Sequence, residues 1–257
     1  MTSLHVSASI GDLKLARIIL DRPKGNVLTL DLMRELIEAL RKVRNMKHLR
    51  MVTLEASGAH FSYGADVAEH KAEVIKPTLE TLRQLVLEIA GFPIPVAALV
   101  KGVCFGGAFE VVLAAHFIFA DQAARFALPE VKLGVLPPAA CALIVKKAGQ
   151  ALADRMILAG EELTGAELYQ LGLVTKTFHA PVLFDAVSEW FKNSLEHYSA
   201  EALRQATAAC RAPLMKCLEE RLIETEHAYL DRLMATHDAN EGIAAFLEKR
   251  PAQWSDA

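Results

Sequence analysis

The chain has few cysteines, and their spacing does not suit a thiol metal site or a disulfide framework. Its 257 residues include only Cys104, Cys141, Cys210 and Cys217, and no pair has the C-x-x-C spacing of a zinc or redox site. A chain of this length buries roughly 75% of its unfolded surface, so its stability requires neither disulfide nor metal. We therefore expect reduced thiols, as in a cytoplasmic protein.

Long apolar runs and blocks of basic residues are also lacking. The most apolar stretch, residues 109–120, is interrupted by Glu110 and His116 and is too short to span a bilayer. Residues 1–14 lack the charged start and apolar stretch of a signal peptide. The net charge is −3, and no block of lysines and arginines forms the cationic cluster that binds the phosphate backbone of nucleic acids. We expect a cytoplasmic protein that binds neither membrane nor nucleic acid.

The histidines give no sign of a metal centre. None of the nine forms an H-x-x-x-H pair or lies in a cysteine cluster, so we expect no metal. His70 could face a pocket after the glycine at position 64, but a surface or core position is the preferred interpretation.

The first half of the chain alternates strand-like and helix-like segments. Short apolar segments predict strands at residues 13–20, 51–56, 96–100 and 117–120. Helical spacing of apolar residues, with a possible cap at Thr29 for the first segment, predicts helices at residues 30–44, 78–90 and 106–115. Strands separated by such helices indicate an α/β fold with a mostly parallel sheet covered on both faces.

The second half is mostly helical in pattern. From Pro138 onward only residues 174–178 look like a strand. Helices are predicted at residues 182–197, 199–211, 214–236 and 240–249. We predict a core over residues 1–190 that carries the site, followed by a helical region over residues 191–257 that serves oligomerisation.

A glycine-rich segment at residues 102–110 (GVCFGGAFE) follows one predicted strand and opens a helix. It has neither the G-x-G-x-x-G spacing of a dinucleotide site nor the G-K-[ST] of a Walker loop. A tight turn alone would explain it. Alternatively, the N–H of Gly107 lies at a helix N-terminus, where negative charge is favoured, and forms half of an oxyanion hole.

A second glycine turn, residues 61–66 (FSYGAD), resembles the G-x-S-x-G nucleophile elbow. His60 occupies the first glycine position, so a serine nucleophile is not expected. The useful groups here are the backbone N–H groups around Gly64 and Ala65. Asp66 is expected to cap the following helix.

Two glutamates lie in apolar sequence surroundings. Glu110 stands between Phe109 and Val111, and Glu130 follows Pro129. Burial would raise the pKa of either carboxyl toward the range that suits general acid–base catalysis. A salt bridge to an arginine for Glu110, and a turn position for Glu130, are the alternatives.

Taken together, these segments resemble the crotonase (enoyl-CoA hydratase/isomerase) superfamily. FSYGAD precedes GVCFGGAFE by about 40 residues, and the LPE of residues 128–130 follows Glu110 by 20. The likeness extends from residues 20–26 to residues 241–250. It implies a spiral of ββα repeats with a helical C-terminal trimerisation region, assembled as a trimer or a dimer of trimers (a homohexamer).

The resemblance also implies the chemistry of the site. The oxygen of an acyl-CoA thioester would accept hydrogen bonds from the N–H groups of Ala65 and Gly107. Glu110 and Glu130 would bind and activate one water, with their acid and base roles left open. Coenzyme A is then part of the substrate, and no separate cofactor is expected.

The implied coenzyme A contacts come from three places. Lys24 matches a position near the phosphates, the turn around Tyr63 matches the adenine contact, and two C-terminal residues match positions that reach the coenzyme A of a neighbouring subunit. With Lys24, the predicted contact residues are Ser62, Tyr63, Gly64, Asp66, Phe246 and Lys249.

One run departs from the common pattern of fatty-acyl hydratases. Residues 136–142 read LPPAACA where a Pro-Gly-Ala-Gly-Gly-Thr-like run is usual. With residues 61–70, this run resembles family members that hydrate a cyclic dienoyl-CoA in the breakdown of aromatic compounds. A generic short-chain enoyl-CoA hydratase is one alternative, and a non-catalytic CoA- or RNA-binding protein of the same fold is another.

Overall fold

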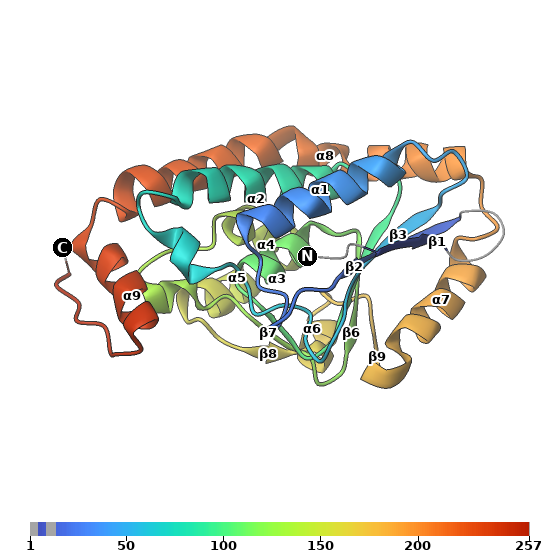
Figure 1. Cartoon of the computed structure of the whole chain (residues 1–257). Coiled ribbons are helices and arrows are strands. Elements are labelled where there is room, and N and C mark those ends of the chain that lie inside the picture. The colour runs from blue at the N-terminus through green and yellow to red at the C-terminus, as the bar shows by residue number, and fades with distance from the viewer. Residues whose placement is uncertain (1–4, 9–13, 257) are drawn as a thin grey trace.

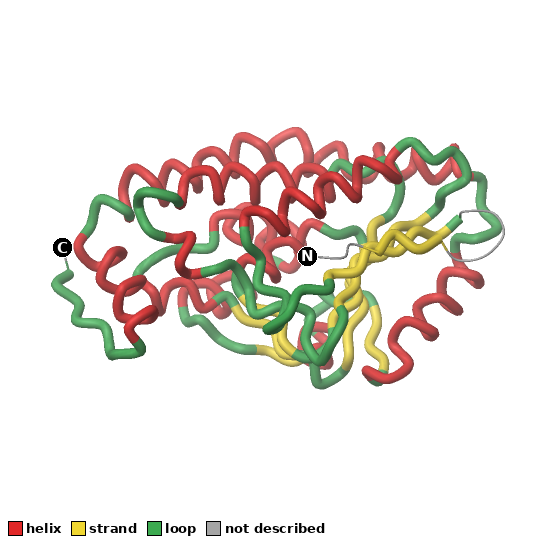
Figure 2. The backbone as a smooth tube through the Cα atoms, viewed as in Figure 1, coloured by secondary structure: helices red, strands yellow, loops and turns green. Residues whose placement is uncertain are grey.

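The structure is a computed structural model that describes residues 5–8 and 14–256, and it contains two sheets (Figures 1 and 2). The larger sheet has the order β1-β2-β3-β4-β6-β9; β1 is antiparallel to β2, and the other pairs are parallel. Its strands are β1 (His5–Ala8), β2 (Leu15–Leu20), β3 (Met51–Ala56), β4 (Val96–Val100), β6 (Phe117–Asp121) and β9 (Lys176–Phe178). The smaller sheet consists of β5 (Val103–Phe105), β7 (Arg125–Ala127) and β8 (Leu163–Thr164).

Successive ββα units connect the two sheets. In two consecutive units the first strands, β4 and β6, pair in the larger sheet, and the second strands, β5 and β7, pair in the smaller one. The parallel bridge between Ser62 and Cys104 continues the smaller sheet to the segment after β3, and the bridge between Leu28 and Ala65 continues it to the segment after β2. Each unit therefore shifts by one strand, which is the spiral of repeats that the sequence resemblance implied.

The larger sheet is buried on both faces because its side chains alternate between two apolar clusters. In β3 and β4, Val52, Leu54 and Ala98 belong to the main core, while Ala97 and Leu99 face the other side. On that other side they meet α7 (Leu183–Ser194), which lies apart from the remaining helices in Figure 1. This explains the unbroken apolar character of β4, whereas β3 also contains Thr53 and Glu55.

The main core is covered by helices that lie side by side along the top of Figure 1. They are α1 (Leu30–Arg44), α2 (Ile75–Ala90) and α8 (Ala200–His227), with α3 (Gly107–Ala114) and α4 (Pro138–Ala148) beneath them. The α1 prediction is confirmed, including the cap, since Thr29 accepts a hydrogen bond from the N–H of Leu32. The helix predicted at residues 78–90 begins earlier, because Pro77 lies in its first turn, where no N–H is needed.

The division of the last long helices was predicted wrongly. Separate helices were predicted at residues 199–211 and 214–236, but α8 continues through Pro213. Pro213 has no N–H to donate within the helix, but the helix is held on either side of it. Arg211 donates to the carbonyl of Ala115, while Leu218 and Leu222 are buried in the main core. Because α8 supplies core residues, the predicted region 191–257 packs directly onto the predicted core.

The remaining elements, apart from α9, are short. They are η1 (Val67–His70), η2 (Pro129–Leu133), α5 (Gln150–Ala153), η3 (Asp154–Leu158), α6 (Gly165–Gln170), η4 (Ala180–Val182), η5 (Ala228–Leu233) and α9 (His237–Glu248). The prediction of a single strand after Pro138 was wrong, because β8 precedes β9. Strand β8 has two residues, too few to show any periodicity. Of the strand predicted at residues 13–20, residue 13 lies outside the described residues.

Both ends of α3 are tied to α4. At the carboxyl end, Nζ of Lys147 in α4 donates to the carbonyls of Leu113 and Ala115, at 3.0 and 2.7 Å, and Arg211 of α8 adds a bond to Ala115 at 2.9 Å. The Arg211 cation at this end complements the helix dipole. The amino end of α3 belongs to the site described below.

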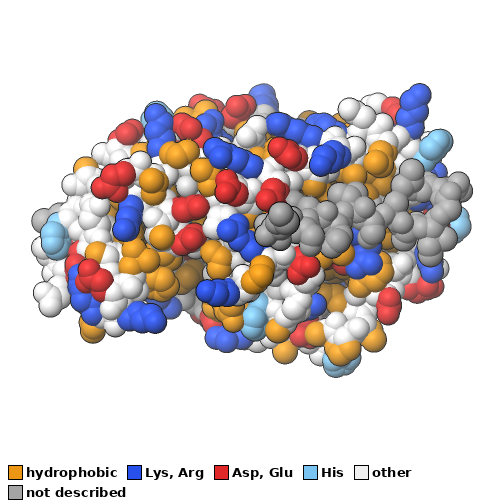
Figure 3. Space-filling model, viewed as in Figure 1, with side chains coloured by type: hydrophobic (Ala, Val, Ile, Leu, Met, Phe, Trp, Pro, Cys, Tyr) orange, Lys and Arg blue, Asp and Glu red, His pale blue; other side chains and the backbone are white. Residues whose placement is uncertain are grey.

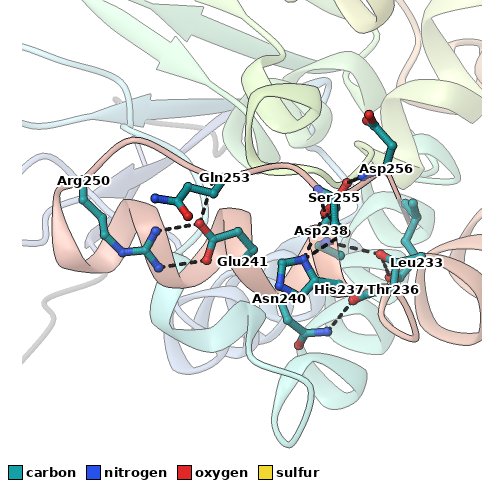
Figure 4. Close-up of polar contacts among 11 residues, drawn as sticks. Leu233, Thr236, His237, Asp238, Asn240, Glu241, Arg250, Gln253, Ser255 and Asp256 are labelled. Carbon is teal, nitrogen blue, oxygen red and sulfur yellow. Dashed lines mark hydrogen bonds and ion pairs between the residues drawn. The ribbon is translucent and has the colours of Figure 1, made fainter.

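The C-terminal residues after α9 fold back on that helix (Figure 4). The Arg250 guanidinium makes two bonds to Glu241, at 2.6 and 2.8 Å, and holds the pKa of that carboxyl near 2. Asp238 accepts the N–H groups of Ser255 and Asp256, at 2.8 and 2.9 Å. These contacts fix the end of α9.

None of the described helices is long and apolar enough to cross a membrane. On the face shown in Figure 3, basic and acidic side chains are interspersed rather than gathered by sign.

Candidate active site

Two consecutive units bring the backbone of Ala65 and Gly107 together. Gly107 opens α3, and a Cβ atom built on it would lie 3.6 Å from the backbone nitrogen of Ala65. Within residues 5–8 and 14–256, neither of these two N–H groups donates a hydrogen bond. They are therefore free to bind one oxygen between them, and their use as an oxyanion hole stays a prediction.

The turn that carries Ala65 depends on a glycine and a serine. Gly64 has φ of 102°, and a Cβ there would lie 2.7 Å from the carbonyl oxygen of Phe105. The Ser62 hydroxyl donates to the carbonyl of Asn26 at 2.7 Å and accepts the N–H of Gly64 at 3.1 Å. The predicted contact residue Ser62 thus holds the turn with its side chain.

Glu110 lies in the first turn of α3 and is 2% exposed. Its Oε1 atom accepts the N–H groups of Ala139 and Ala140, at 2.6 and 2.9 Å, at the start of α4. Burial raises the pKa of Glu110 to about 7, although these two N–H groups act in the opposite direction by stabilising the carboxylate. The alternative of a salt bridge to an arginine is wrong.

Glu130 lies in η2, directly after β7 and Pro129, and is also buried. Gly106 has φ of 51°, a conformation that favours glycine, and a Cβ there would lie 2.8 Å from the Oε1 atom of Glu130. Its Oε2 atom is buried and has no hydrogen-bond partner in the described part of the chain. Burial, and then the charge of Glu110, raise the pKa of Glu130 well above its usual range. Near neutral pH the pair therefore holds a proton, which suits acid–base chemistry.

Both carboxyls and both N–H groups border one cavity of about 390 Å³. Most of its wall is apolar, and residues on separate elements supply it: Leu28, Met33, Val67, Leu79, Leu82, Leu133, Leu136 and Pro138. Leu136 and Pro138 belong to the unusual run at residues 136–142. The same run supplies Ala139 and Ala140, which hold Glu110. The run therefore both shapes the cavity and holds the Glu110 carboxyl.

Two cavity residues were missed or misjudged from the sequence. Tyr229 lies in η5 and is 1% exposed, but its place in a helical pattern gave no signal of function. His70 lines the cavity, contrary to the preferred interpretation, and its Nδ1 atom lies 2.9 Å from the carbonyl oxygen of Asp66. Burial lowers the pKa of His70.

The remaining predicted contact residues lie at different places. Tyr63 is half exposed at the cavity edge, and with exposed Lys24 it also lines a second hollow next to the cavity. Asp66 caps η1 by accepting the N–H of Ala68 at 2.9 Å, as predicted. Phe246 is exposed and lines the cavity of its own chain, and Lys249 ends α9 outside it. Their contacts with coenzyme A stay predictions.

The site has no arrangement suited to a metal. Across the described residues, no three histidine, cysteine, aspartate or glutamate side chains are grouped so as to hold an ion.

The chain matches a family model and known proteins over nearly its whole length. The family model described as enoyl-CoA hydratase/isomerase matches residues 12–257. The chain is 38% identical over 245 residues to cyclohexa-1,5-dienecarbonyl-CoA hydratase of Thauera aromatica, covering 95% of this chain and 94% of that protein.

A second relative and a solved structure extend the comparison. The chain is 30% identical over 236 residues to 2,3-dehydroadipyl-CoA hydratase of Escherichia coli K12, covering 91% of this chain and 92% of that protein. An enoyl-CoA hydratase structure from Mycobacterium avium subsp. paratuberculosis matches with a TM-score of 0.85 and 26% identity, covering 99% and 98% of the two chains.

Proposed function

Because the chain belongs to the enoyl-CoA hydratase/isomerase family, we propose that it is a hydratase that adds water to cyclohexa-1,5-diene-1-carbonyl-CoA and forms 6-hydroxycyclohex-1-ene-1-carbonyl-CoA. One observation carries the proposal. Two buried carboxyls with raised pKa values share a cavity with two free backbone N–H groups. This combination suits the addition of water to a double bond that is conjugated with a thioester.

The N–H groups of Ala65 and Gly107 bind the thioester oxygen. When hydroxide adds to the conjugated double bond, negative charge moves onto this oxygen as an enolate. Donors fixed before the reaction stabilise that charge without reorganising, by about 3–4 kcal/mol each if they resemble other oxyanion holes. The hole therefore lowers the barrier to addition.

Glu110 acts as the base and Glu130 as the acid. The Glu110 carboxylate is favoured because Ala139 and Ala140 donate to it. Burial and the charge of Glu110 raise the pKa of Glu130 well above its usual range, and its Oε2 atom has no donor among the described residues. Glu110 takes one proton from water as the oxygen bonds to carbon. Glu130 then delivers a proton to carbon, and the next turnover begins after the proton returns from one carboxyl to the other.

With a cyclic diene, the structure of the product determines which ring carbon receives this proton. The oxygen adds to the ring carbon next to the one that bears the thioester, and the enolate extends over the second double bond. For the product to keep a double bond conjugated with the thioester, the proton must reach the ring carbon opposite the new hydroxyl. An acid and a base on separate elements, η2 and α3, suit this separation.

The ring substrate is supported by the run at residues 136–142 and by the relative from Thauera aromatica. Leu136 and Pro138 place bulk in the cavity wall, and the wall is largely apolar, as a hydrocarbon ring requires. Such a substrate belongs to anaerobic benzoyl-CoA degradation. We further propose assembly as a trimer or a dimer of trimers, which ultracentrifugation would test.

Steady-state kinetics with two substrates test the proposed function. We expect a higher kcat/KM for the cyclic dienoyl-CoA than for crotonyl-CoA. The reverse order would identify a short-chain enoyl-CoA hydratase, consistent with the straight-chain compound in the name of the Escherichia coli relative. Absence of turnover with every acyl-CoA in well-folded protein would instead indicate a binding protein.

A further inference from the structure

A buried tyrosine in the cavity has no assigned task. Tyr229 comes from η5, beyond the α8 helix, and its side chain is 1% exposed. In the described part of the chain, four buried side-chain atoms lack a hydrogen-bond partner, and only Glu130 Oε2 and Tyr229 Oη belong to residues that line the active-site cavity. Because a buried tyrosine hydroxyl normally has a partner, the missing partner is expected to arrive with the substrates.

The surroundings of Tyr229 limit what that partner can be. His70 packs against its ring, with centroids 6.4 Å apart, but Nδ1 of His70 already faces the carbonyl of Asp66. Burial and the charges of Glu130 and Glu110 raise the pKa of Tyr229, so the phenol stays protonated. The hydroxyl is therefore a neutral group that can accept and donate a hydrogen bond to a small polar partner.

The proposed mechanism does not assign a hydrogen-bond acceptor to the second hydrogen of the attacking water. When Glu110 takes the first proton, the second hydrogen stays on the oxygen that bonds to carbon, and it needs an acceptor in a largely apolar cavity. Glu110 Oε1 is occupied by two N–H groups, and Glu130 delivers the proton to carbon. Of the two unpartnered atoms, Tyr229 Oη remains available.

We propose that the hydroxyl of Tyr229 accepts this second hydrogen and so binds the attacking water and then the hydroxyl of the product. This inference rests on the proposed hydratase function but not on the identity of the acyl group, because every hydratase of this type adds the same oxygen. It assigns a catalytic role to a residue from the C-terminal region that was predicted to serve oligomerisation.

The test compares Tyr229→Phe with the matched control Tyr198→Phe, which removes the same atom from an exposed tyrosine outside the cavity. We expect Tyr229→Phe to lower kcat about tenfold and to raise the KM of the hydroxylated product in the reverse direction about tenfold. The inhibition constant of cyclohexanecarbonyl-CoA, which carries no hydroxyl, should change less than twofold. A structural role of the ring would weaken the binding of both compounds.

Thermal unfolding of the free enzyme supplies a second readout. Since the hydroxyl has no partner among the described residues, Tyr229→Phe should unfold at or above the wild-type temperature. Unfolding well below it would reveal a structural partner and overturn the proposal, as would kinetic constants within twofold of Tyr198→Phe.

The two proposals fail separately. If the wild type does not hydrate the cyclic diene but hydrates crotonyl-CoA, the substrate assignment fails, and the Tyr229 comparison is repeated with crotonyl-CoA and its 3-hydroxy product. If the wild type hydrates the diene and Tyr229→Phe matches the control, only the role of Tyr229 fails.

Discussion

The Oε1 atom of Glu110 lies 2.6 Å from the backbone nitrogen of Ala139, so the first turn of α4 holds an acid–base group carried by α3. The bond supports a carboxylate that burial alone would keep protonated, and this opposition brings the pKa of Glu110 to about 7. The reactivity of Glu110 therefore depends on a neighbouring helix as much as on burial.

Replacing Glu130 by glutamine should lower kcat by about 10²–10⁴, because the variant loses a positioned acid–base group. Binding of a hydroxyl-free acyl-CoA should change little, since the N–H groups of Ala65 and Gly107 remain. Steady-state kinetics and titration calorimetry measure the two effects. Glu73→Gln, at an exposed position, serves as the control; near-normal turnover of Glu130→Gln would falsify the two-carboxyl mechanism.

At Glu110, glutamine and alanine should have different effects on stability. Both should abolish most activity, but the glutamine oxygen can still accept the N–H groups of Ala139 and Ala140. Alanine leaves these buried donors unpaired, which costs about 1–3 kcal/mol of unfolding free energy. Urea denaturation of both variants measures the difference, and equal stability would show that the two bonds contribute little.

The raised pKa of Glu110 also makes stability depend on pH. A carboxyl whose folded pKa exceeds its unfolded value stabilises the fold below the unfolded pKa, and this contribution is lost as pH rises through the folded pKa. For Glu110 the window runs from the usual carboxyl pKa to about 7, and the loss is of the order of 3 kcal/mol. Denaturation of wild type and Glu110→Gln across this window measures it. The variant should show a flatter profile, and parallel profiles would contradict the prediction.

Gly64→Ala should damage both fold and catalysis, because the added Cβ would lie 2.7 Å from the carbonyl of Phe105 and displace the N–H of Ala65. Gly172→Ala is the matched control: its φ is also positive, at 79°, but no atom lies within 4 Å of the added carbon. The control should lose about 1–2 kcal/mol from strain alone and keep its activity. Melting followed by circular dichroism and kcat/KM distinguish the backbone strain that both variants share from the steric clash of Gly64→Ala alone. Equal losses of stability and activity in the two variants would show that the close approach to Phe105 is unimportant.

Local order was sufficient to place some groups of the site. Glu110 follows a glycine pair at the start of a helix, and Gly107 lies at that same N-terminus, so their places in the fold could be predicted from residues next to each other. Their roles came from the family resemblance and stay predictions. The α/β core followed from apolar strands that alternate with helices. The prediction failed for α8, where contacts between residues distant in the sequence matter. The helix continues through Pro213, and its residues Leu218 and Leu222 pack in the main core.

The cavity itself could not be predicted in the same way. Tyr229 lies more than 90 residues from Glu130 in the sequence, and only the packing of the C-terminal region places it beside the carboxyls. The run at residues 136–142 was noticed for its unusual composition, but its hydrogen bonds to Glu110 involve backbone atoms that any residue except proline would supply. Backbone hydrogen bonds of this kind therefore cannot be predicted from a sequence pattern.

The hydrogen bonds between α3 and α4 fix one part of the site, while other elements of the cavity wall can change independently. Helix α3 is bonded to α4 near both of its ends, through Glu110 at one end and Lys147 at the other, so the two helices cannot slide past each other without breaking both connections. The N–H of Gly107 and the carboxyl of Glu110 therefore move as one body. Selection for another acyl group would act with least harm on η1 and α9, which contribute to the cavity wall without belonging to that body.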